Sequence, residues 1–325
     1  MISAQGLTKF YGDRCAVSEL DFTIEGGEIV GFLGLNGAGK TTTLRILACL
    51  LLPSRGTVRI HDLDVVDNPH EIRKLVGFLP ETPPLYAEMT VDSYLRFVGR
   101  LRGLGGARLR ERLAQVVQQT NLEEVRQQVI GSLSHGYRQR VGIAQAVIHD
   151  PPVLILDEPI QGLDPVQIVE MRELVRGLKG RHTILLSSHI LSEIHQTCDR
   201  LMVLQNGALA AVGTERELTA RLTGSQRLSL LVRGHTEPLL RLVRSAEHVQ
   251  SCEAEGADHG APAESGLVRL SVTSSQDIRE LLSRRLVESG FGVLELGRAE
   301  AQLETVFLQL ARGGEPTAFP APPQA

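Results

Sequence analysis

The sequence has no run of apolar residues long enough to cross a membrane. No stretch approaches the roughly 18 consecutive apolar residues that a membrane-spanning helix needs. The first residues, Met1 to Gln5, also lack the basic-then-apolar pattern of a secretory signal. If this chain works at a membrane, we therefore expect a partner to supply the membrane-spanning part.

A surplus of basic residues is also missing. The 325 residues include 34 Lys and Arg against 38 Asp and Glu, which gives a formal charge of −4 and a pI of about 6.2. This balance argues against a nucleic-acid-binding protein that relies on a strongly basic surface, although a local basic patch would be compatible with it.

Cysteine is scarce. The four cysteines, Cys15, Cys49, Cys198 and Cys252, have no spacing typical of a zinc site or a redox pair. We expect all four to be reduced residues with a packing role.

The chain does contain apolar runs of strand length, and its length suggests about two domains. A run that does not alternate polar and apolar residues predicts a strand buried on both faces of a largely parallel sheet. Three runs fit this description: Ile29–Leu33, Val153–Leu156 and Thr183–Leu186. A fourth run, Leu201–Leu204, precedes Asn206-Gly207 and a second apolar run, which predicts a hairpin.

Between residues 91 and 128 the apolar residues take up helical spacing. The residues that show this spacing are Leu95, Val98, Leu101, Leu109, Leu113, Val116 and Val117. The pattern predicts a small helical subdomain, at about residues 88–150, inserted into an α/β core.

After residue 222 the composition predicts a separate α+β domain of ferredoxin-like topology, residues 223–312. The predicted order is strand, helix, strand, strand, helix, strand: Leu228–Val232, Glu237–Ala246, Val249–Glu253, Leu267–Val272, Ser275–Ser289 and Gly292–Leu296. We expect Glu253–Gly266 to be a solvated loop rather than a metal site, Leu303–Leu310 to be a helix, and residues 313–325 to be a disordered tail.

A phosphate-binding loop follows the strand that ends at Leu33. Its residues are Gly34, Leu35, Asn36, Gly37, Ala38, Gly39, Lys40, Thr41 and Thr42, and a helical run, Thr43–Leu51, comes next. This is the P-loop pattern, in which glycines let backbone N–H groups point at phosphate oxygens at the start of a helix. Lys40 can place its charge on the β- and γ-phosphates, and the Thr41 hydroxyl can ligate Mg²⁺. The sequence therefore predicts a nucleoside-triphosphate site.

Further segments resemble, in order, the markers of the ABC-type ATPases. They are Tyr11 (adenine-stacking aromatic), Gly77–Glu81 (Q-loop), Leu133–Arg140 (signature), Val153–Pro159 (Walker B strand), Gly162–Pro165 (D-loop) and Ser187–His189 (switch histidine). The resemblance covers about residues 1–222. It implies a P-loop NTPase fold of ABC type, with an antiparallel β subdomain and an inserted helical subdomain, and ATP and Mg²⁺ as cofactors.

The chemistry of these residues agrees with the resemblance. Asp157 follows a buried strand, so its carboxylate is fixed near the P-loop and can hold Mg²⁺ or its waters. Glu158 can accept a proton from the attacking water, and His189, after a strand that ends on the same sheet edge, is expected to contact the γ-phosphate. Without this context an Asp-Glu pair would indicate a solvated strand end, and a lone histidine or an aromatic such as Tyr11 a packing residue.

Two departures from the family pattern indicate which members of the family the chain resembles most. Glu81 stands where the family usually has Gln, which keeps an oxygen for the metal and water but adds a negative charge. His135 and Tyr137 replace a common Gly and Gln, whereas Ser134 and Gly136, expected to touch phosphate, are retained. This variant resembles the ABC-2-type exporter ATPases, including drug-resistance and gliding-motility-like members. We expect hydrolysis to survive both departures.

The resemblance implies a partner arrangement. Two ATPase domains hold two ATP molecules head to tail, so the P-loop of one chain faces Ser134–Gly136 of the other, in a homodimer or in a heterodimer with a related ATPase. An ABC-2-type transmembrane permease would contact Glu81–Met89 and Val91–Leu101, where Pro83 and Pro84 either stiffen a docking loop or form a simple surface turn. The chain would lie in the cytoplasm on the inner face of the plasma membrane, and no nucleic-acid partner is expected.

Two other functions remain as alternatives. A non-transport ABC ATPase would act on nucleic acid or ribosomes, but such members usually carry coiled coils, zinc modules or two ATPase cassettes, which this chain lacks. A purely regulatory module would need an inactive ATPase, against which the retained Lys40, Asp157 and Glu158 argue.

Overall fold

The computed structural model describes residues 1–194, 197–214, 217–218, 226–255 and 266–298. The chain divides into two compact units, the first ending at Thr214 and the second beginning after it. Each unit is described by itself. The predicted domain boundary at residue 222 lies outside the described residues.

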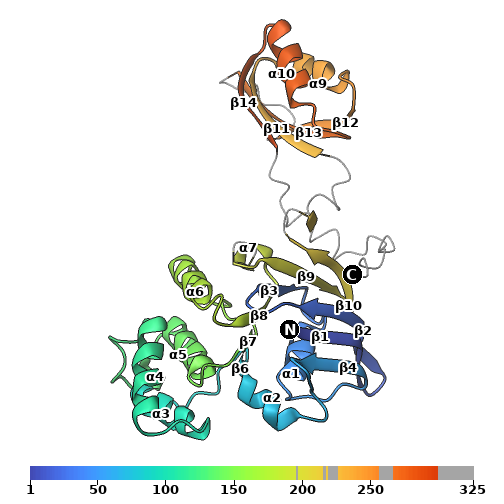
Figure 1. Ribbon diagram of the computed structural model, residues 1–325. Coiled ribbons are helices and arrows are strands. Elements are labelled where there is room, and N and C mark those ends of the chain that lie inside the picture. Colours follow the sequence, from blue (N-terminus) through green and yellow to red (C-terminus); the bar gives the residue numbers. More distant parts are fainter. Residues whose placement is uncertain (195–196, 215–216, 219–225, 256–265, 299–325) are drawn as a thin grey trace. The chain divides into compact units, whose positions relative to one another are not determined.

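The first unit contains two sheets (Figure 1). The antiparallel sheet has the order β2-β1-β4-β5 and is built from β1 (Ile2–Tyr11), β2 (Arg14–Ile24), β4 (Arg55–Ile60) and β5 (Leu63–Asp64). The second has the order β10-β9-β3-β8-β7-β6 and contains β3 (Ile29–Leu33), β6 (Val76–Leu79), β7 (Val153–Leu156), β8 (Thr183–Ser188), β9 (Arg200–Gln205) and β10 (Ala208–Gly213). It is parallel except for β10.

The predicted buried strands are confirmed. Every residue of β3, β7 and β8 is buried, because this sheet is covered on both faces. The hairpin between β9 and β10 is also confirmed, since Asn206 (φ 49°) and Gly207 (φ 81°) both take the left-handed conformation that such a turn requires.

The helices of the first unit are α1 (Lys40–Leu47), α2 (Pro69–Leu75), α3 (Val91–Leu101), α4 (Gly106–Gln119), the 3₁₀ turn η1 (Ile130–Ser132), α5 (His135–Val147), α6 (Pro165–Gly177) and α7 (Leu191–Ile194). Helices α3, α4 and α5 lie side by side as the predicted helical segment, as Figure 1 shows. Leu95 and Leu113 are fully buried there, whereas Leu101 is 70% exposed and does not join the core.

Helix α1 is shorter than predicted. We expected it to reach Leu51, but it ends at Leu47. Cys49 takes a left-handed conformation (φ 54°), and the Leu50 N–H returns to the Arg45 carbonyl at 2.9 Å. A left-handed residue that ends a helix in this way is usually glycine. Because the residue here is a cysteine, the sequence carried no signal for the end of the helix.

Helix α5 approaches strand β6 very closely. A Cβ built on Gly77 would lie 2.1 Å from the Ala146 carbonyl oxygen, and one built on Gly142 would lie 2.5 Å from Leu79 Cδ1 and 3.0 Å from Pro83 Cγ. The two glycines therefore let helix and strand pack with nothing between them.

The second unit confirms the ferredoxin-like prediction. Its elements are β11 (Gln226–Arg233), α9 (Thr236–Arg244), β12 (Val249–Glu255), β13 (Leu267–Ser274), α10 (Arg279–Glu288) and β14 (Gly292–Arg298), and its antiparallel sheet has the order β12-β13-β11-β14. Leu239, Val243, Leu282 and Leu286 of the helices are buried with the sheet.

One detail of this unit differs from the prediction. Helix α10 begins at Arg279 rather than at Ser275, because the Asp277 carboxylate accepts a hydrogen bond from the Arg279 N–H at 3.3 Å in a preceding turn. Leu281 of this helix is 37% exposed. The predicted helix Leu303–Leu310, the tail and most of the loop Glu253–Gly266 lie outside the described residues.

In the part of the chain that the structure describes, no helix has the length and apolar character needed to span a membrane. The four cysteines are free thiols, as predicted, but Cys15 is exposed and has no packing role.

Candidate active site

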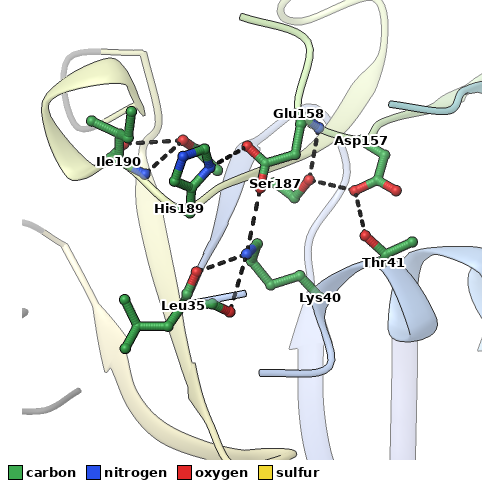
Figure 2. Close-up of polar contacts among 10 residues, drawn as sticks. Leu35, Lys40, Thr41, Asp157, Glu158, Ser187, His189 and Ile190 are labelled. Atoms are coloured by element: carbon green, nitrogen blue, oxygen red, sulfur yellow. Dashed lines mark hydrogen bonds and ion pairs between the residues drawn. The ribbon is translucent and has the colours of Figure 1, made fainter. Parts of the chain in front are cut away.

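Three strands bring the predicted site residues to one edge of the parallel sheet. Strands β3, β8 and β7 are neighbours and run in the same direction, so the segments that follow them meet at their carboxyl ends. These segments contain the P-loop, His189 and the pair Asp157-Glu158, and Figure 2 shows their side chains pointing toward one another.

The P-loop curls around the Lys40 side chain. The Lys40 ammonium donates to the Gly34 carbonyl at 2.7 Å and to the Leu35 carbonyl at 3.4 Å. Gly39 has a φ of 101°, and a Cβ there would lie 2.7 Å from the Ala16 carbonyl oxygen, so both the conformation and the space require glycine. Helix α1 has no acidic residue in its own first turn, so its positive end can favour an anion.

Lys40 also faces the carboxylate that the sequence predicts as the base. Its Nζ lies 3.4 Å from Glu158 Oε1, and the two side chains are only 5% and 7% exposed. The other oxygen, Glu158 Oε2, lies 3.0 Å from His189 Nδ1. The Glu158 carboxylate is thus held between a lysine from the P-loop and the histidine after β8 (Figure 2).

Glu158 has an unusual backbone. Its φ is 49°, in the left-handed region that a residue with a Cβ adopts at a cost of about 1–2 kcal/mol. Its N–H donates to Ser187 Oγ at 2.8 Å, which holds it in this conformation. Such an outlier at a cluster of charged groups is typical of a functional position.

Asp157 lies next to the P-loop hydroxyl. Thr41 Oγ1 donates to Asp157 Oδ1 at 3.1 Å, and Ser187 Oγ donates to the same oxygen at 2.7 Å. Burial raises the pKa of Asp157, while the hydrogen bonds from Ser187 and Thr41 oppose that shift.

This donor set fits Mg²⁺. A buried carboxylate beside a hydroxyl would gain from a divalent cation, and Mg²⁺ on a nucleotide usually takes one or two such protein ligands together with phosphate oxygens. Within the described ranges, no group of three or more His, Cys, Asp or Glu side chains could hold a metal by itself. Thr41 and Asp157 are therefore the protein ligands that we expect.

Ser187 is a site residue that the sequence reasoning missed. Its hydroxyl is buried, accepts from the Glu158 N–H and donates to the Asp157 carboxylate, so it connects both acidic residues. Leu156 of β7 pairs with Leu186 of β8, and the next residues along both strands are therefore neighbours. The available signal was a polar residue that ends a run of buried apolar residues.

The turn between β1 and β2 lies beside the P-loop. Tyr11 pairs with Arg14 across this turn, and Arg14 Nη2 lies 3.6 Å from the position of a Cβ on Gly37. The Tyr11 side chain is 48% exposed, with Lys9 Nζ 5.5 Å from its ring centroid. Adenine stacking by Tyr11 stays a prediction, and Arg14 is a second residue that sequence reasoning missed.

The other predicted residues lie outside this cluster. Glu81 is exposed, and its backbone carbonyl faces the Gln139 amide at 3.5 Å. Ser134 is exposed and caps α5 by accepting from the Tyr137 N–H at 3.4 Å, and Gly136 follows within the helix. The structure thus brings the P-loop, Asp157, Glu158 and His189 together. Among the described residues no hydrogen bond or ion pair joins the Glu81 or Ser134 side chain to them, although the Leu79 carbonyl, two residues before Glu81, accepts from the Asp157 N–H at 2.8 Å.

Comparisons with known proteins identify relatives of this chain. A family described as "ABC transporter" matches residues 17–161. The bacitracin transport ATP-binding protein BcrA of Bacillus licheniformis is 32% identical over 97% of this chain and 98% of its own length. The linearmycin resistance ATP-binding protein LnrL of Bacillus subtilis is 29% identical over 95% of this chain and 98% of its own. A dimeric ATP-binding cassette, solved after hydrolysis with ADP and Pi bound, is 25% identical and covers 66% of this chain and 98% of its own, with a TM-score of 0.61.

Proposed function

This chain belongs to the family of ABC transporter ATP-binding proteins, and from that membership we propose that it hydrolyses ATP to power an exporter whose membrane part is an ABC-2-type permease. The direction of transport is supported by relatives of nearly the same length that are named for bacitracin transport and linearmycin resistance. These relatives are transport proteins, so nothing favours the nucleic-acid or ribosome alternative.

The observation that carries the proposal is the placement of Glu158. Its carboxylate lies between Lys40, at 3.4 Å, and His189, at 3.0 Å, and its backbone is fixed by Ser187. In the proposed step, the oxygen of a water forms a bond to the γ-phosphorus of ATP while the bond to the β–γ bridging oxygen breaks. Glu158 accepts the water's proton, and ADP and inorganic phosphate leave.

The neighbouring residues hold the nucleotide during this step. Lys40 and the N-terminus of α1 would stabilise the charge on the β- and γ-phosphates, and His189 would contact the γ-phosphate. Thr41 and Asp157 would hold Mg²⁺, which neutralises phosphate charge when bound. Tyr11 would stack on the adenine, and Glu81 would face the metal and the water.

The position of Ser134 supports a dimer. Ser134 and Gly136 lie outside the cluster around Lys40 of their own chain, as expected if they serve the nucleotide of a partner. We propose a head-to-tail homodimer, or a heterodimer with a related ATPase, that closes on ATP and opens after hydrolysis. It would act in the cytoplasm on the inner face of the plasma membrane.

An exposed aromatic group supports the proposed permease contact. The Tyr86 ring lies 6.0 Å from the Tyr94 ring and 5.7 Å from the Phe97 ring, and Tyr86 is 49% exposed. Leu101, 70% exposed, belongs to the same helix as Phe97. Apolar side chains at the surface around Pro83 and Pro84 fit a protein partner better than a simple turn.

The Glu158→Gln variant tests the assignment. It keeps the shape of the side chain but cannot accept a proton, so ATP should still bind, turnover should fall by at least about 100-fold, and an ATP-dependent dimer should accumulate. Gel filtration with and without ATP and a phosphate-release assay measure these effects, with Glu173→Gln on the exposed side of α6 as a control. Unchanged phosphate release would show that Glu158 is not the base.

A further inference from the structure

The His135 side chain lies on the turn that follows Glu158. Its Nε2 donates to the Gln161 carbonyl oxygen, 3.0 Å away. Gly162 has a φ of 74°, and a Cβ built there would lie 3.4 Å from the same nitrogen. This is an ordinary contact distance, so Gly162 packs against the imidazole ring, and a glycine at position 135, the residue common in the family pattern, could not form the hydrogen bond.

Gln161 belongs to the same hydrogen-bonded turn as Glu158. The Gln161 N–H donates to the Glu158 carbonyl at 3.2 Å, and the Leu163 N–H donates to the Ile160 carbonyl at 3.3 Å. Movement of Gln161 relative to Glu158 would break these bonds. The His135 ring is thus fixed to the segment that also sets the Glu158 backbone.

A second contact joins the same two segments. A Cβ built on Gly136 would lie 2.7 Å from Gln167 Oε1, so the Gln167 amide packs directly on the start of α5. Gln167 is itself held by its N–H, which donates to Asp164 Oδ1 at 2.9 Å at the start of α6. The signature segment therefore contacts the turn after Glu158 at Gln161 and the start of α6 at Gln167.

We infer that His135 is a positioning residue that fixes Ser134 relative to Glu158 of the same chain. The inference rests on the proposed head-to-tail dimer, in which Glu158 acts on the chain's own nucleotide while Ser134 serves the nucleotide of the partner. His135 then connects the two nucleotide sites of the dimer through one hydrogen bond in each chain. A carbonyl oxygen only accepts, so Nε2 must carry a proton to donate this bond.

The test uses the full-length chain with Glu158→Gln as the background. In this background the dissociation constant of the ATP-bound dimer should rise when His135→Ala is added. The bond is already present in the monomer, so its loss weakens the dimer only because the signature segment must then be ordered on association. If that ordering costs at most one hydrogen bond per chain, about 1 kcal/mol or roughly fivefold, the dissociation constant of the homodimer should rise by up to about 25-fold. His135→Gln, whose amide N–H can reach the Gln161 carbonyl, should restore affinity to within about threefold.

Two further measurements separate positioning from general damage. His135 lies outside the P-loop, so His135→Ala should bind a fluorescent ATP analogue in the monomer with unchanged affinity. In the otherwise wild-type chain, it should raise the ATP concentration for half-maximal rate and lower the Hill coefficient toward one. A structural defect without a positioning role would lower binding and rate together and would not be rescued by His135→Gln.

The outcomes distinguish this inference from the proposed function. If Glu158→Gln forms an ATP-dependent dimer whose affinity His135→Ala leaves unchanged, or if His135→Gln is as weak as His135→Ala, the role of His135 is refuted and the proposed function stands. If Glu158→Gln forms no dimer with ATP at all, the proposed function fails, and the inference fails with it.

Discussion

Replacing Ser187 with alanine should disturb both acidic residues of the site at once. The Ser187 hydroxyl is fully buried, donates to the Asp157 carboxylate at 2.7 Å and accepts from the Glu158 N–H at 2.8 Å. Ser187→Ala removes both bonds and leaves a buried backbone N–H without its acceptor. No other single hydroxyl described above bonds to both of these residues.

The magnitude follows from the two lost bonds. A hydrogen bond to a charged group contributes about 1.5–3 kcal/mol, and an unsatisfied buried N–H costs about 1–3 kcal/mol. The two losses overlap, because they come from one atom and the neighbours can relax, so we expect a decrease of about 3 kcal/mol in the free energy of unfolding. For a unit of this size, such a change lowers Tm by about 6–12 °C. The rate should fall as well, by about 10- to 100-fold, because the left-handed Glu158 backbone loses its anchor.

Differential scanning calorimetry and phosphate release measure these effects. Thr120→Val is the matched control. It removes a fully buried hydroxyl that donates to the Val116 carbonyl at 2.7 Å within α4, and it should cost less than about 1 kcal/mol without changing the rate.

Two outcomes for Ser187→Ala would contradict the roles given to its hydroxyl. If Ser187→Ala melts within about 2 °C of the wild type and hydrolyses ATP at the wild-type rate, then the hydroxyl neither stabilises the acidic pair nor holds the Glu158 backbone. If only stability falls, Ser187 supports the fold but does not position the base.

Three other changes test separate parts of the structure. Gly77→Ala should destabilise the first unit by at least about 3 kcal/mol in thermal unfolding, because its Cβ would lie 2.1 Å from the Ala146 carbonyl, and a normal melting temperature would contradict that close approach. Burial lowers the pKa of His149 from 6.5 to about 4, so the folded chain binds this proton less readily than the unfolded chain, and stability falls as the pH drops through that interval. Between pH 8 and pH 5 the free energy of unfolding should therefore fall by about 2 kcal/mol less in His149→Leu than in the wild type. Denaturant titrations at the two pH values measure this difference, and an equal fall in both proteins would refute the lowered pKa of His149. Arg14→Gln should weaken ATP binding about fivefold in calorimetric titrations and weaken adenosine binding less, since the guanidinium lies beside the P-loop at Gly37.

The sequence predicted most of what depends on local patterns. Buried parallel strands give continuous apolar runs, so the predicted strands Val153–Leu156 and Thr183–Leu186 match the observed strands to within two residues. Asn206-Gly207 predicted the hairpin because few residue pairs suit that turn. The placement of Lys40 near Glu158 was also within reach, because parallel neighbouring strands bring their carboxyl ends together.

What escaped prediction depends on contacts between distant segments. Ser187 gains its role only because β7 and β8 are neighbours in register, which the sequence of β8 does not reveal. Arg14 lies beside the P-loop because of the way one sheet packs on the other. The early end of α1 at Leu47 is set by a left-handed Cys49, a residue type that carries no stop signal.

The close packing of α5 on β6 has a mechanical consequence. Helix α5 spans His135–Val147, about 20 Å at 1.5 Å per residue, and Gly142 lets Pro83 rest directly on it. Leu79 and Pro83 both pack against the Gly142 position, so Pro83 has no room to move toward α5 unless the helix moves as well. Ser134 caps the start of the same helix, and a displacement of α5 would therefore displace Ser134 too.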